Sequence, residues 1–201
     1  SLTGATPSCA TPLRAETAKI GRYFAYKLNT TQADPMEYSC QRNYMLMVTD
    51  GYWNESESST IKRVDGTDIG NTDNSTSTAA RPYYDGAQAS TTCPTVGTGR
   101  GGTASSCRTL ADIAFHYYST DLRTSALGNA TNTSLGNDVA TNNVFTTSND
   151  PNIIQHMNFY AMGLGIEGKL AFRSDYLTAG LGDYADIIAG TKNWPAVANL
   201  D

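Results

Sequence analysis

One apolar run of strand length stands out along the chain, because it ends abruptly in an aspartate and a glycine. Residues 44–49 are almost wholly apolar, and Asp50 and Gly51 follow at once. A strand buried in a parallel sheet reads as a short continuous apolar run rather than as an alternating one. We therefore predict a buried parallel strand here. Taken alone, Asp50 is more simply a turn residue than a ligand.

Helical periodicity appears on both sides of this strand. Apolar residues spaced three to four apart predict a helix over residues 12–28, with Thr11 as the N-cap and Pro12 at the first helical position. A second helix is predicted to open at Thr109, because Asp112 three residues later completes a capping-box pattern.

A second strand over residues 158–166 and a weaker third helix over residues 177–188 complete the pattern. The order of helix, strand, helix, strand and helix is a βαβ alternation, which predicts a parallel sheet and an α/β fold. Residues 52–108 lack strong periodicity, and we interpret them as an irregular insertion into a single domain that spans residues 1–201. Two strong strands make a small sheet, so we expect a partial domain or one that takes a strand from elsewhere.

Composition narrows the class of protein. Hydrophobic residues make up 39% of the chain and charged residues 16%, and Ser, Thr, Asn and Gly fill the difference, as is typical of secreted and cell-surface proteins. The net charge of −5 leaves no basic stripe, which argues against nucleic-acid binding. No apolar stretch approaches the roughly 18 residues of a membrane span. The chain starts at Ser1 without a charged-then-apolar leader, so we expect a processed product or a fragment.

Four cysteines lack the C-x-x-C spacing of zinc and redox sites: Cys9, Cys40, Cys93 and Cys107. They allow two bridges in three pairings, and we favour Cys9 with Cys40 and Cys93 with Cys107. The second bridge would close a short polar loop and stabilise the fold by roughly 3 kcal/mol. Bridges imply an oxidising compartment, the periplasm or the exterior. The alternative is four unrelated buried thiols.

Enzymatic motifs are absent from the sequence. It has no G-x-S-x-G elbow, no phosphate-binding loop and no dinucleotide fingerprint, so we predict no enzyme and no organic cofactor. His116 and His156 lie far apart in sequence without nearby acidic or cysteine ligands, which makes a zinc site improbable. We expect both histidines to pack or to form hydrogen bonds.

Two stretches of the insertion are candidates for binding. The first is a cluster of oxygen-bearing side chains that could hold calcium or could be a solvated acidic turn: Asp65, Asp68, Asn71 and Asp73. The second is a set of aromatic residues that could form an adhesive surface or could cover the edge of the sheet: Tyr52, Trp53, Tyr83 and Tyr84.

Short motifs along nearly the whole chain form one ordered series. It runs through Thr11-Pro12-Leu13-Arg14, Ile20-Gly21-Arg22-Tyr23-Phe24, Tyr38-Ser39-Cys40-Gln41-Arg42-Asn43, Thr49-Asp50-Gly51-Tyr52-Trp53-Asn54, Gly70-Asn71-Thr72-Asp73, Pro82-Tyr83-Tyr84-Asp85-Gly86, Thr109-Leu110-Ala111-Asp112-Ile113-Ala114, Tyr117-Tyr118, Asp121-Leu122-Arg123, Asp150-Pro151, Gln155-His156-Met157 and Gly163-Leu164-Gly165. The series resembles the N-terminal von Willebrand factor A-like region of the PilY1/PilC family of type IV pilus tip proteins.

This resemblance implies a Rossmann-like von Willebrand factor A-type domain, present here in part and with long loop insertions. It also implies a cation site, for Ca²⁺ or Mg²⁺, built from three pieces of sequence. Thr11 matches the threonine piece, with Thr6 as a second candidate, and Asp50 matches the late aspartate. The Asp-x-Ser-x-Ser piece is expected upstream of Ser1, outside the chain.

The resemblance implies a non-enzymatic extracellular adhesion or assembly module at the pilus, exported through the periplasm. Its expected partners are minor pilins or a host or surface ligand, and also the rest of its own polypeptide or identical chains. The alternative that we carry forward is a structural subunit of an extracellular filament, formed by strand exchange between neighbouring chains.

Overall fold

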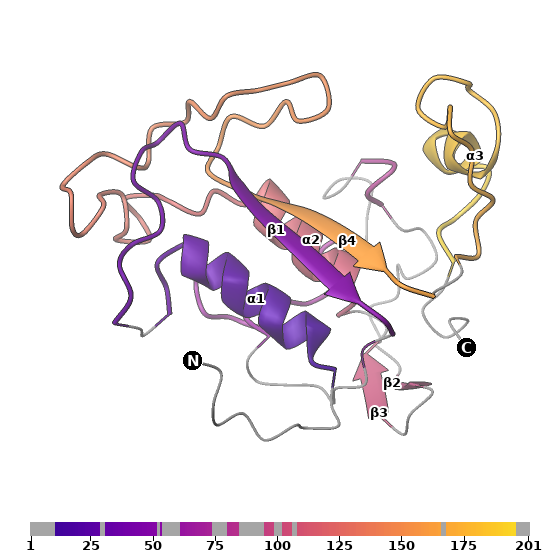
Figure 1. The fold of residues 1–201 in the computed structure, drawn as a ribbon, viewed down its shortest axis with the longest axis horizontal. Coiled ribbons are helices and arrows are strands. Elements are labelled where there is room, and N and C mark those ends of the chain that lie inside the picture. The colour runs from indigo at the N-terminus through magenta and orange to yellow at the C-terminus, as the bar shows by residue number, and fades with distance from the viewer. Residues whose placement is uncertain are drawn as a thin grey trace.

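The structure is a computed structural model that describes residues 11–28, 31–51, 53, 61–73, 80–84, 95–98, 102–105, 108–165 and 168–195. Its elements, in chain order, are α1 (Leu13–Phe24), β1 (Asn43–Thr49), β2 (Thr95–Thr98), β3 (Gly102–Ser105), α2 (Leu110–Ser119), β4 (Met157–Gly163) and α3 (Asp183–Ala189) (Figure 1).

The centre of the fold is a two-stranded parallel sheet. β1 pairs with β4 along its whole length, from Asn43 beside Met157 to Thr49 beside Gly163. Parallel neighbours need a crossover connection, and α2 lies in the chain between the two strands. The predicted βαβ unit and the parallel pairing are therefore confirmed.

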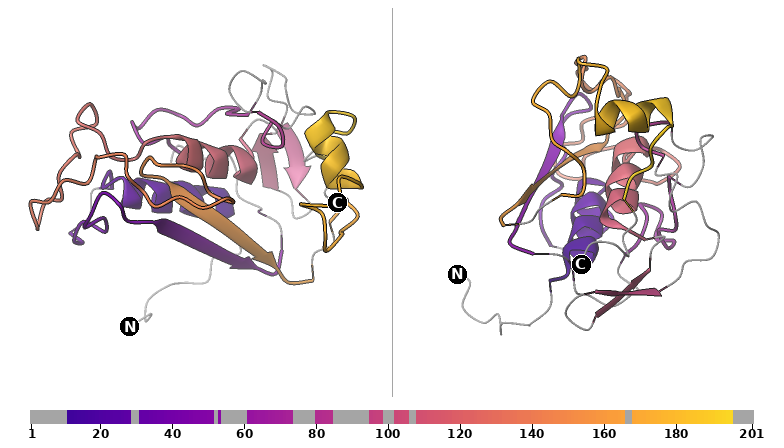
Figure 2. Two further views of the ribbon diagram at one scale, coloured as in Figure 1. Left: turned by 90° about the horizontal axis from the view of Figure 1, so that it is seen from above. Right: turned by 90° about the vertical axis from the view of Figure 1, so that its right-hand side faces the viewer.

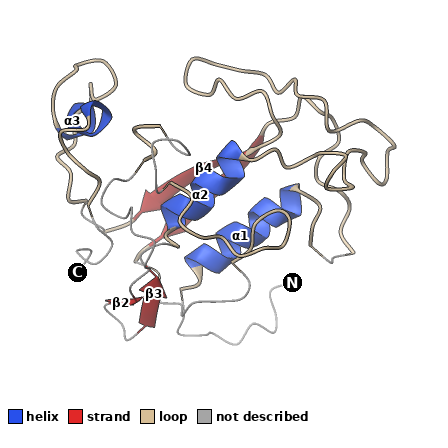
Figure 3. Ribbon diagram, turned by 180° about the vertical axis from the view of Figure 1, so that it is seen from behind, coloured by secondary structure: helices blue, strands red, loops and turns tan. Residues whose placement is uncertain are grey.

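Both long helices cover the same face of this sheet. In Figure 2 the ribbons of α1 and α2 lie on one side of β1 and β4, and Figure 3 shows them in front of the strands when the molecule is seen from behind. Met45, Met47 and Met157 point inward and join the core with buried residues of the two helices. We call the helix-covered side the inner face and the opposite side the outer face.

The prediction that β1 is buried on both sides was wrong, because its side chains on the outer face are exposed. Burial alternates along β1, with Asn43, Met45 and Met47 buried, whereas the side chains between them are exposed. The apolar run 44–49 is thus continuous in sequence but only half buried in the described structure. The run still has the composition of a strand with two covered faces.

The first helix starts one residue later and ends earlier than its periodicity predicts. Thr11 is not the N-cap: Pro12 holds that position without a side-chain hydrogen bond, and the carbonyl of Thr11 accepts from the backbone N–H of Leu13 at 2.9 Å. The helix ends at Phe24 because Tyr26 takes a left-handed conformation, with a φ of 50°.

The second helix begins as predicted. The Thr109 side chain accepts from the backbone N–H of Asp112, and the Asp112 carboxylate accepts from the backbone N–H of Thr109, which is a complete capping box. The third helix is shorter than predicted. Gly180 and Gly182 have φ angles of 62° and 89°, which interrupt a helix, and Gly190 ends it in the left-handed region.

The insertion predicted over residues 52–108 has local order in its described parts. β2 and β3 form an antiparallel pair, with Thr95 beside Ser105.

Residues 80–84 join the α3 region to α2. Arg81 donates to the carbonyl of Ile187 at 3.0 Å, and the Trp194 indole donates to the carbonyl of Pro82 at 2.6 Å.

Candidate functional site

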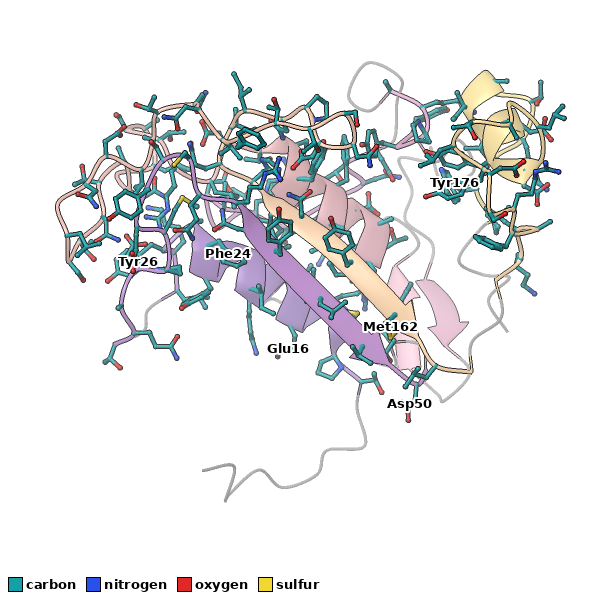
Figure 4. All side chains as sticks on the ribbon, turned by 45° about the horizontal axis from the view of Figure 1, so that its top comes forward. Glu16, Phe24, Tyr26, Asp50, Met162 and Tyr176 are labelled. Atoms are coloured by element: carbon teal, nitrogen blue, oxygen red, sulfur yellow. The ribbon has the colours of Figure 1, made fainter. Side chains whose placement is uncertain are left out.

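The carboxyl ends of β1 and β4 meet at one edge of the sheet, where open α/β sheets bind their ligands. The first residues of α1 lie toward the same edge, so the positive end of the helix dipole faces it (Figures 1 and 4). Of the sequence-predicted residues, this edge carries Asp50 directly after β1, Thr11 two residues before α1, and Trp53 beyond the turn.

Asp50 lies at the tip of this edge, and its side chain is exposed (Figure 4). The turn beneath it is fixed by Thr49, whose hydroxyl donates to the carbonyl of Gly51 at 2.8 Å and accepts from the Gly51 N–H at 3.2 Å. The backbone that carries the carboxylate is thus held while the carboxylate faces solvent. An exposed carboxylate on a fixed backbone suits a residue that contributes one ligand to a binding site whose other ligands come from elsewhere.

Thr11 is half-buried before α1, and Thr6 lies outside the described residues. In the part of the chain that the structure describes, no three His, Cys, Asp or Glu side chains come together in a way that could hold a metal ion. Asp50 and Thr11 alone would supply two oxygen ligands, whereas Ca²⁺ takes six to eight. The cation site predicted from the resemblance stays a prediction.

The four residues of the predicted loop calcium site have different surroundings. Asp65 accepts from the backbone N–H and the hydroxyl of Thr67, and these bonds lower the pKa of its carboxyl group. The exposed carboxylate of Asp68 pairs with Lys62. Asp73 is buried and Asn71 is half-buried. Asp65 and Asp68 thus have partners within the turn, and the predicted loop calcium site stays a prediction.

The described aromatic residues lie in different surroundings, and the predicted adhesive surface stays a prediction. The guanidinium of Arg14 lies 5.7 Å from the Trp53 ring centroid, at the N-terminal end of α1. Tyr83 stacks on Phe115 of α2 with ring centroids 5.3 Å apart. Arg81 lies over the Tyr84 ring at 5.1 Å, while Tyr52 falls outside the described residues. The ring of Tyr83 remains about half exposed and is the more accessible candidate.

A polar cluster at the amino end of β4 was missed by the sequence reasoning. His156 is almost fully buried, and its Nε2 lies 3.2 Å from a carboxylate oxygen of Asp150. Asn158 donates to the same oxygen at 3.0 Å, and the hydroxyl of Tyr118 reaches the other oxygen at 3.4 Å. Burial alone would raise the pKa of Asp150, but the Asn158 hydrogen bond and the His156 charge outweigh it and lower that pKa.

This cluster joins the end of α2 to the start of β4. Asp150, His156 and Tyr118 fall within the ordered motifs, but no sequence pattern pairs these three residues. The edge-on contact between the rings of Tyr118 and His156, at 5.1 Å, encloses the imidazole. The enclosed geometry suits a structural role, as predicted for His156.

His116 confirms the prediction of a packing and hydrogen-bonding histidine. Its Nε2 accepts from the backbone N–H of Val64 at 3.3 Å, and its Nδ1 lies 3.1 Å from the hydroxyl of Thr120. Burial lowers the pKa of His116 to about 4, because the imidazolium form would lose solvation and face the charge of Arg63. His116 is therefore a neutral link between α2 and the 61–73 segment.

Of the four cysteines, only Cys40 lies among the described residues. It is exposed and is not bridged in the structure. Cys9, Cys93 and Cys107 fall outside the described ranges. Both predicted pairings therefore stay predictions. Over the described helices, none has the length and apolar character that a membrane crossing requires.

Comparison with known proteins gives one consistent result. The chain is similar to the type IV pilus biogenesis factor PilY1 of Pseudomonas aeruginosa, with 33% identity over 202 residues in strain PAO1 and 30% over 200 residues in strain PAK. These matches cover 95% and 94% of the chain but only 16% and 15% of the relatives. The PilY1 of strain UCBPP-PA14 matches at 30% identity over 98% of the chain. No family model and no solved structure matches.

Proposed function

We propose a function on the premise that the chain belongs to the PilY1 family. The chain spans about one sixth of the length of the curated relatives that it matches. The chain would act as part of a type IV pilus biogenesis factor, as a non-enzymatic, extracellular module for assembly or adhesion. The observation that supports this proposal is the match of almost the whole chain to three type IV pilus biogenesis factors. Minor pilins or a surface ligand are the partners that this function needs.

We propose that the contact lies at the carboxyl edge of the β1–β4 sheet. Asp50 is exposed there on a fixed turn, at the point where ligands of α/β sheets bind. Together with Thr11 and residues outside this chain, it would hold Ca²⁺ or Mg²⁺, whose open coordination position takes an acidic group from a partner. The domain would then be a von Willebrand factor A-type domain that is completed by further sequence.

A deletion tests the module's role. In the organism that encodes the chain, an in-frame deletion of residues 11–195 is expected to abolish surface pili or the adhesion that they mediate. Pili counted by electron microscopy and attachment counted on a surface report the two effects separately. Normal values for both, at a normal level of the shortened protein, would overturn the proposed function.

Isothermal titration of the full-length protein with Ca²⁺ or Mg²⁺ tests the cation site. Asp50→Ala is expected to abolish the heat of the site, whereas Glu16→Ala is expected to retain it, because Glu16 is exposed on α1 and pairs with Lys19. Binding that is unchanged in Asp50→Ala would reject the site assignment. It would leave the proposed role in pilus assembly standing.

One observation favours the alternative of a filament subunit. Over the described residues the sheet has two strands, so β1 and β4 each have one edge without a partner strand. Such edges accept strands from neighbouring chains. Light scattering during size exclusion separates the two functions: a filament subunit forms larger species as concentration rises, whereas a pilus module stays at one mass.

A further inference from the structure

Two loops meet beyond the amino ends of β1 and β4, at the opposite end of the sheet from the proposed cation site (Figures 1 and 4). They comprise residues 31–42 and residues 124–155, and neither contains a helix or a strand. Side-chain amides join them: Asn132, for example, donates to the carbonyl of Met36 at 2.8 Å. Long loops without secondary structure are uncommon in compact domains and are usually functional when they are ordered.

Phe145 is presented on a fixed turn of the second loop. Val144 is buried, and its backbone N–H donates to the carbonyl of Ile153 at 3.0 Å. Thr147 and Asp150 close the turn through two backbone hydrogen bonds of 2.8 and 3.2 Å. Phe145 is nevertheless 70% exposed. The fixed backbone thus holds a large apolar ring in solvent.

The half-buried guanidinium of Arg42 lies against this ring. Its Nε donates to the carbonyl of Phe145 at 2.7 Å, and its Cζ lies 5.1 Å from the ring centroid. Among the described residues no carboxylate pairs with Arg42, and its buried Nη2 has no hydrogen-bond acceptor. Arg123, by contrast, donates to Asp34 from both Nη atoms. A buried donor that has lost water without gaining an acceptor is unfavourable, so Arg42 lacks a partner that Arg123 has.

We propose that Arg42 and Phe145 form a docking point for a partner protein. The guanidinium would receive an Asp or Glu carboxylate of the partner, and the ring would contact an apolar side chain next to that carboxylate. The inference rests on the proposed function, which requires a partner. It concerns a contact at the other end of the sheet from Asp50, and this contact needs no cation.

The chemistry of the guanidinium selects a carboxylate. A planar guanidinium binds carboxylates through two parallel hydrogen bonds. The carbonyl of Phe145 already occupies Nε of Arg42, so the two Nη atoms remain for an end-on pair. The chain has a net charge of −5, yet its described part supplies no carboxylate to this cation. Because Phe145 lies largely in solvent, its ring can turn aside and admit the partner's carboxylate to Nη2.

The surroundings of this docking point favour a protein as the partner. Arginine and aromatic residues are enriched at protein interfaces and dominate the residues that carry binding energy. The same two loops also expose Tyr38, Leu135 and Ile153. Loops that are already fixed lose little conformational freedom on binding, which removes one of the main costs of association.

Fluorine NMR of the full-length protein tests the carboxylate contact. 4-Fluorophenylalanine replaces Phe145, and the labelled protein is titrated with benzoate, which combines a carboxylate with an apolar ring. Benzamide is the neutral probe of the same shape, and inorganic phosphate is an anion without a carboxylate. We expect benzoate to shift the resonance in a saturable manner, with an affinity at least about tenfold higher than that of either other probe.

Arg42→Gln in the labelled protein should weaken the binding of benzoate at least about tenfold, although the glutamine amide can still donate to the Phe145 carbonyl. Arg173→Gln is the matched control, because Arg173 is exposed and pairs with Asp175 far along the chain. An unchanged titration in Arg42→Gln, or equal affinities for benzoate and benzamide, would overturn the proposal. Equal affinities for benzoate and phosphate would also overturn it, because they would identify a general anion site. If Arg42→Gln does not fold, the three probes on the otherwise unchanged protein decide.

A charge reversal in the organism that encodes the chain tests the partner. Arg42→Glu should lower the number of surface pili or of attached cells at least about tenfold at a normal protein level, whereas Arg173→Glu should not. Normal values for both in Arg42→Glu would overturn the docking point, while the deletion of residues 11–195 would still report on the proposed function. If Arg42→Glu lowers the protein level, Arg42→Gln takes its place.

Discussion

Arg123 and Asp34 form a buried ion pair, although 89 residues separate them in the chain. Both side chains have an exposed fraction of 0%. The two groups meet in a bidentate arrangement, with Nη1 donating to Oδ2 at 3.0 Å and Nη2 donating to Oδ1. Arg123 also donates from Nε to the carbonyl of Phe24 at 2.9 Å, so the pair fixes the C-terminal end of α1.

Asp34→Asn is expected to lower the free energy of unfolding by about 3–5 kcal/mol, because it leaves the Arg123 guanidinium buried beside a neutral amide. Chemical denaturation of the purified protein measures the change. Asp175→Asn is the matched control, since its pair with Arg173 is exposed and should contribute less than about 1 kcal/mol. Equal losses in the two variants would contradict the assigned role.

The depressed pKa of His116 predicts that the protein loses stability in mild acid. The folded pKa is about 4 and the ordinary value is 6.5, so the unfolded chain binds more protons between these two values. The stabilising contribution is complete above pH 6.5 and decreases as the pH falls toward 4. It amounts to roughly 3 kcal/mol at most.

His116→Gln isolates this effect from the titration of carboxylates. The amide of glutamine can donate and accept like the neutral imidazole, but it does not titrate. We expect the unfolding free energy of the variant to depend less on pH between 6.5 and 4 than that of the wild type. Identical slopes in parallel denaturation series would show that His116 does not carry the dependence.

Gly21 provides a test of how closely α1 and α2 pack. A Cβ atom on Gly21 would lie 2.4 Å from ring atoms of Tyr117, and Tyr117 is fully buried. Gly21→Ala is therefore expected to destabilise the fold by about 1–3 kcal/mol through overpacking, although alanine favours helices. Gly70→Ala is the control, because nothing lies within 4 Å of its added Cβ. Thermal unfolding of both variants decides the comparison.

Local chemistry made some elements predictable from sequence. The Thr109 and Asp112 capping box needs only residues three positions apart, and it forms as predicted. The pairing of β1 with β4 followed from two apolar runs and a helix between them. The predicted start of α1 was wrong. Thr11 and Pro12 match a cap pattern, but in the structure the carbonyl of Thr11 accepts from the Leu13 N–H in a tight turn.

Other features depend on contacts that no local pattern contains. Asp34 meets Arg123, and Asp150 meets His156 and Tyr118, only because the folded chain brings their elements together. Burial of one face of β1 could not be read from its apolar run, since the run is the same whether or not a further element covers the outer face. The carboxyl edge was predictable in place, whereas the cation site proposed there would also need residues outside this chain.

Asp112 caps α2 and also accepts a hydrogen bond from the 61–73 segment. Its removal therefore tests how this segment is held against α2. Its buried carboxylate accepts from the backbone N–H of Thr109 at 2.9 Å and from the backbone N–H of Thr72 at 2.7 Å. Asp112→Ala leaves both donors without this acceptor, and the expected loss is about 2–4 kcal/mol.

Thr109→Ser keeps a hydroxyl at the cap position and should cost less than about 1 kcal/mol. Hydrogen exchange separates the two functions of Asp112 in the same experiment. The amide of Thr72 should lose protection in Asp112→Ala but keep it in Thr109→Ser, because only the aspartate reaches Thr72. Unchanged protection at Thr72 in Asp112→Ala would mean that other contacts hold this segment against α2.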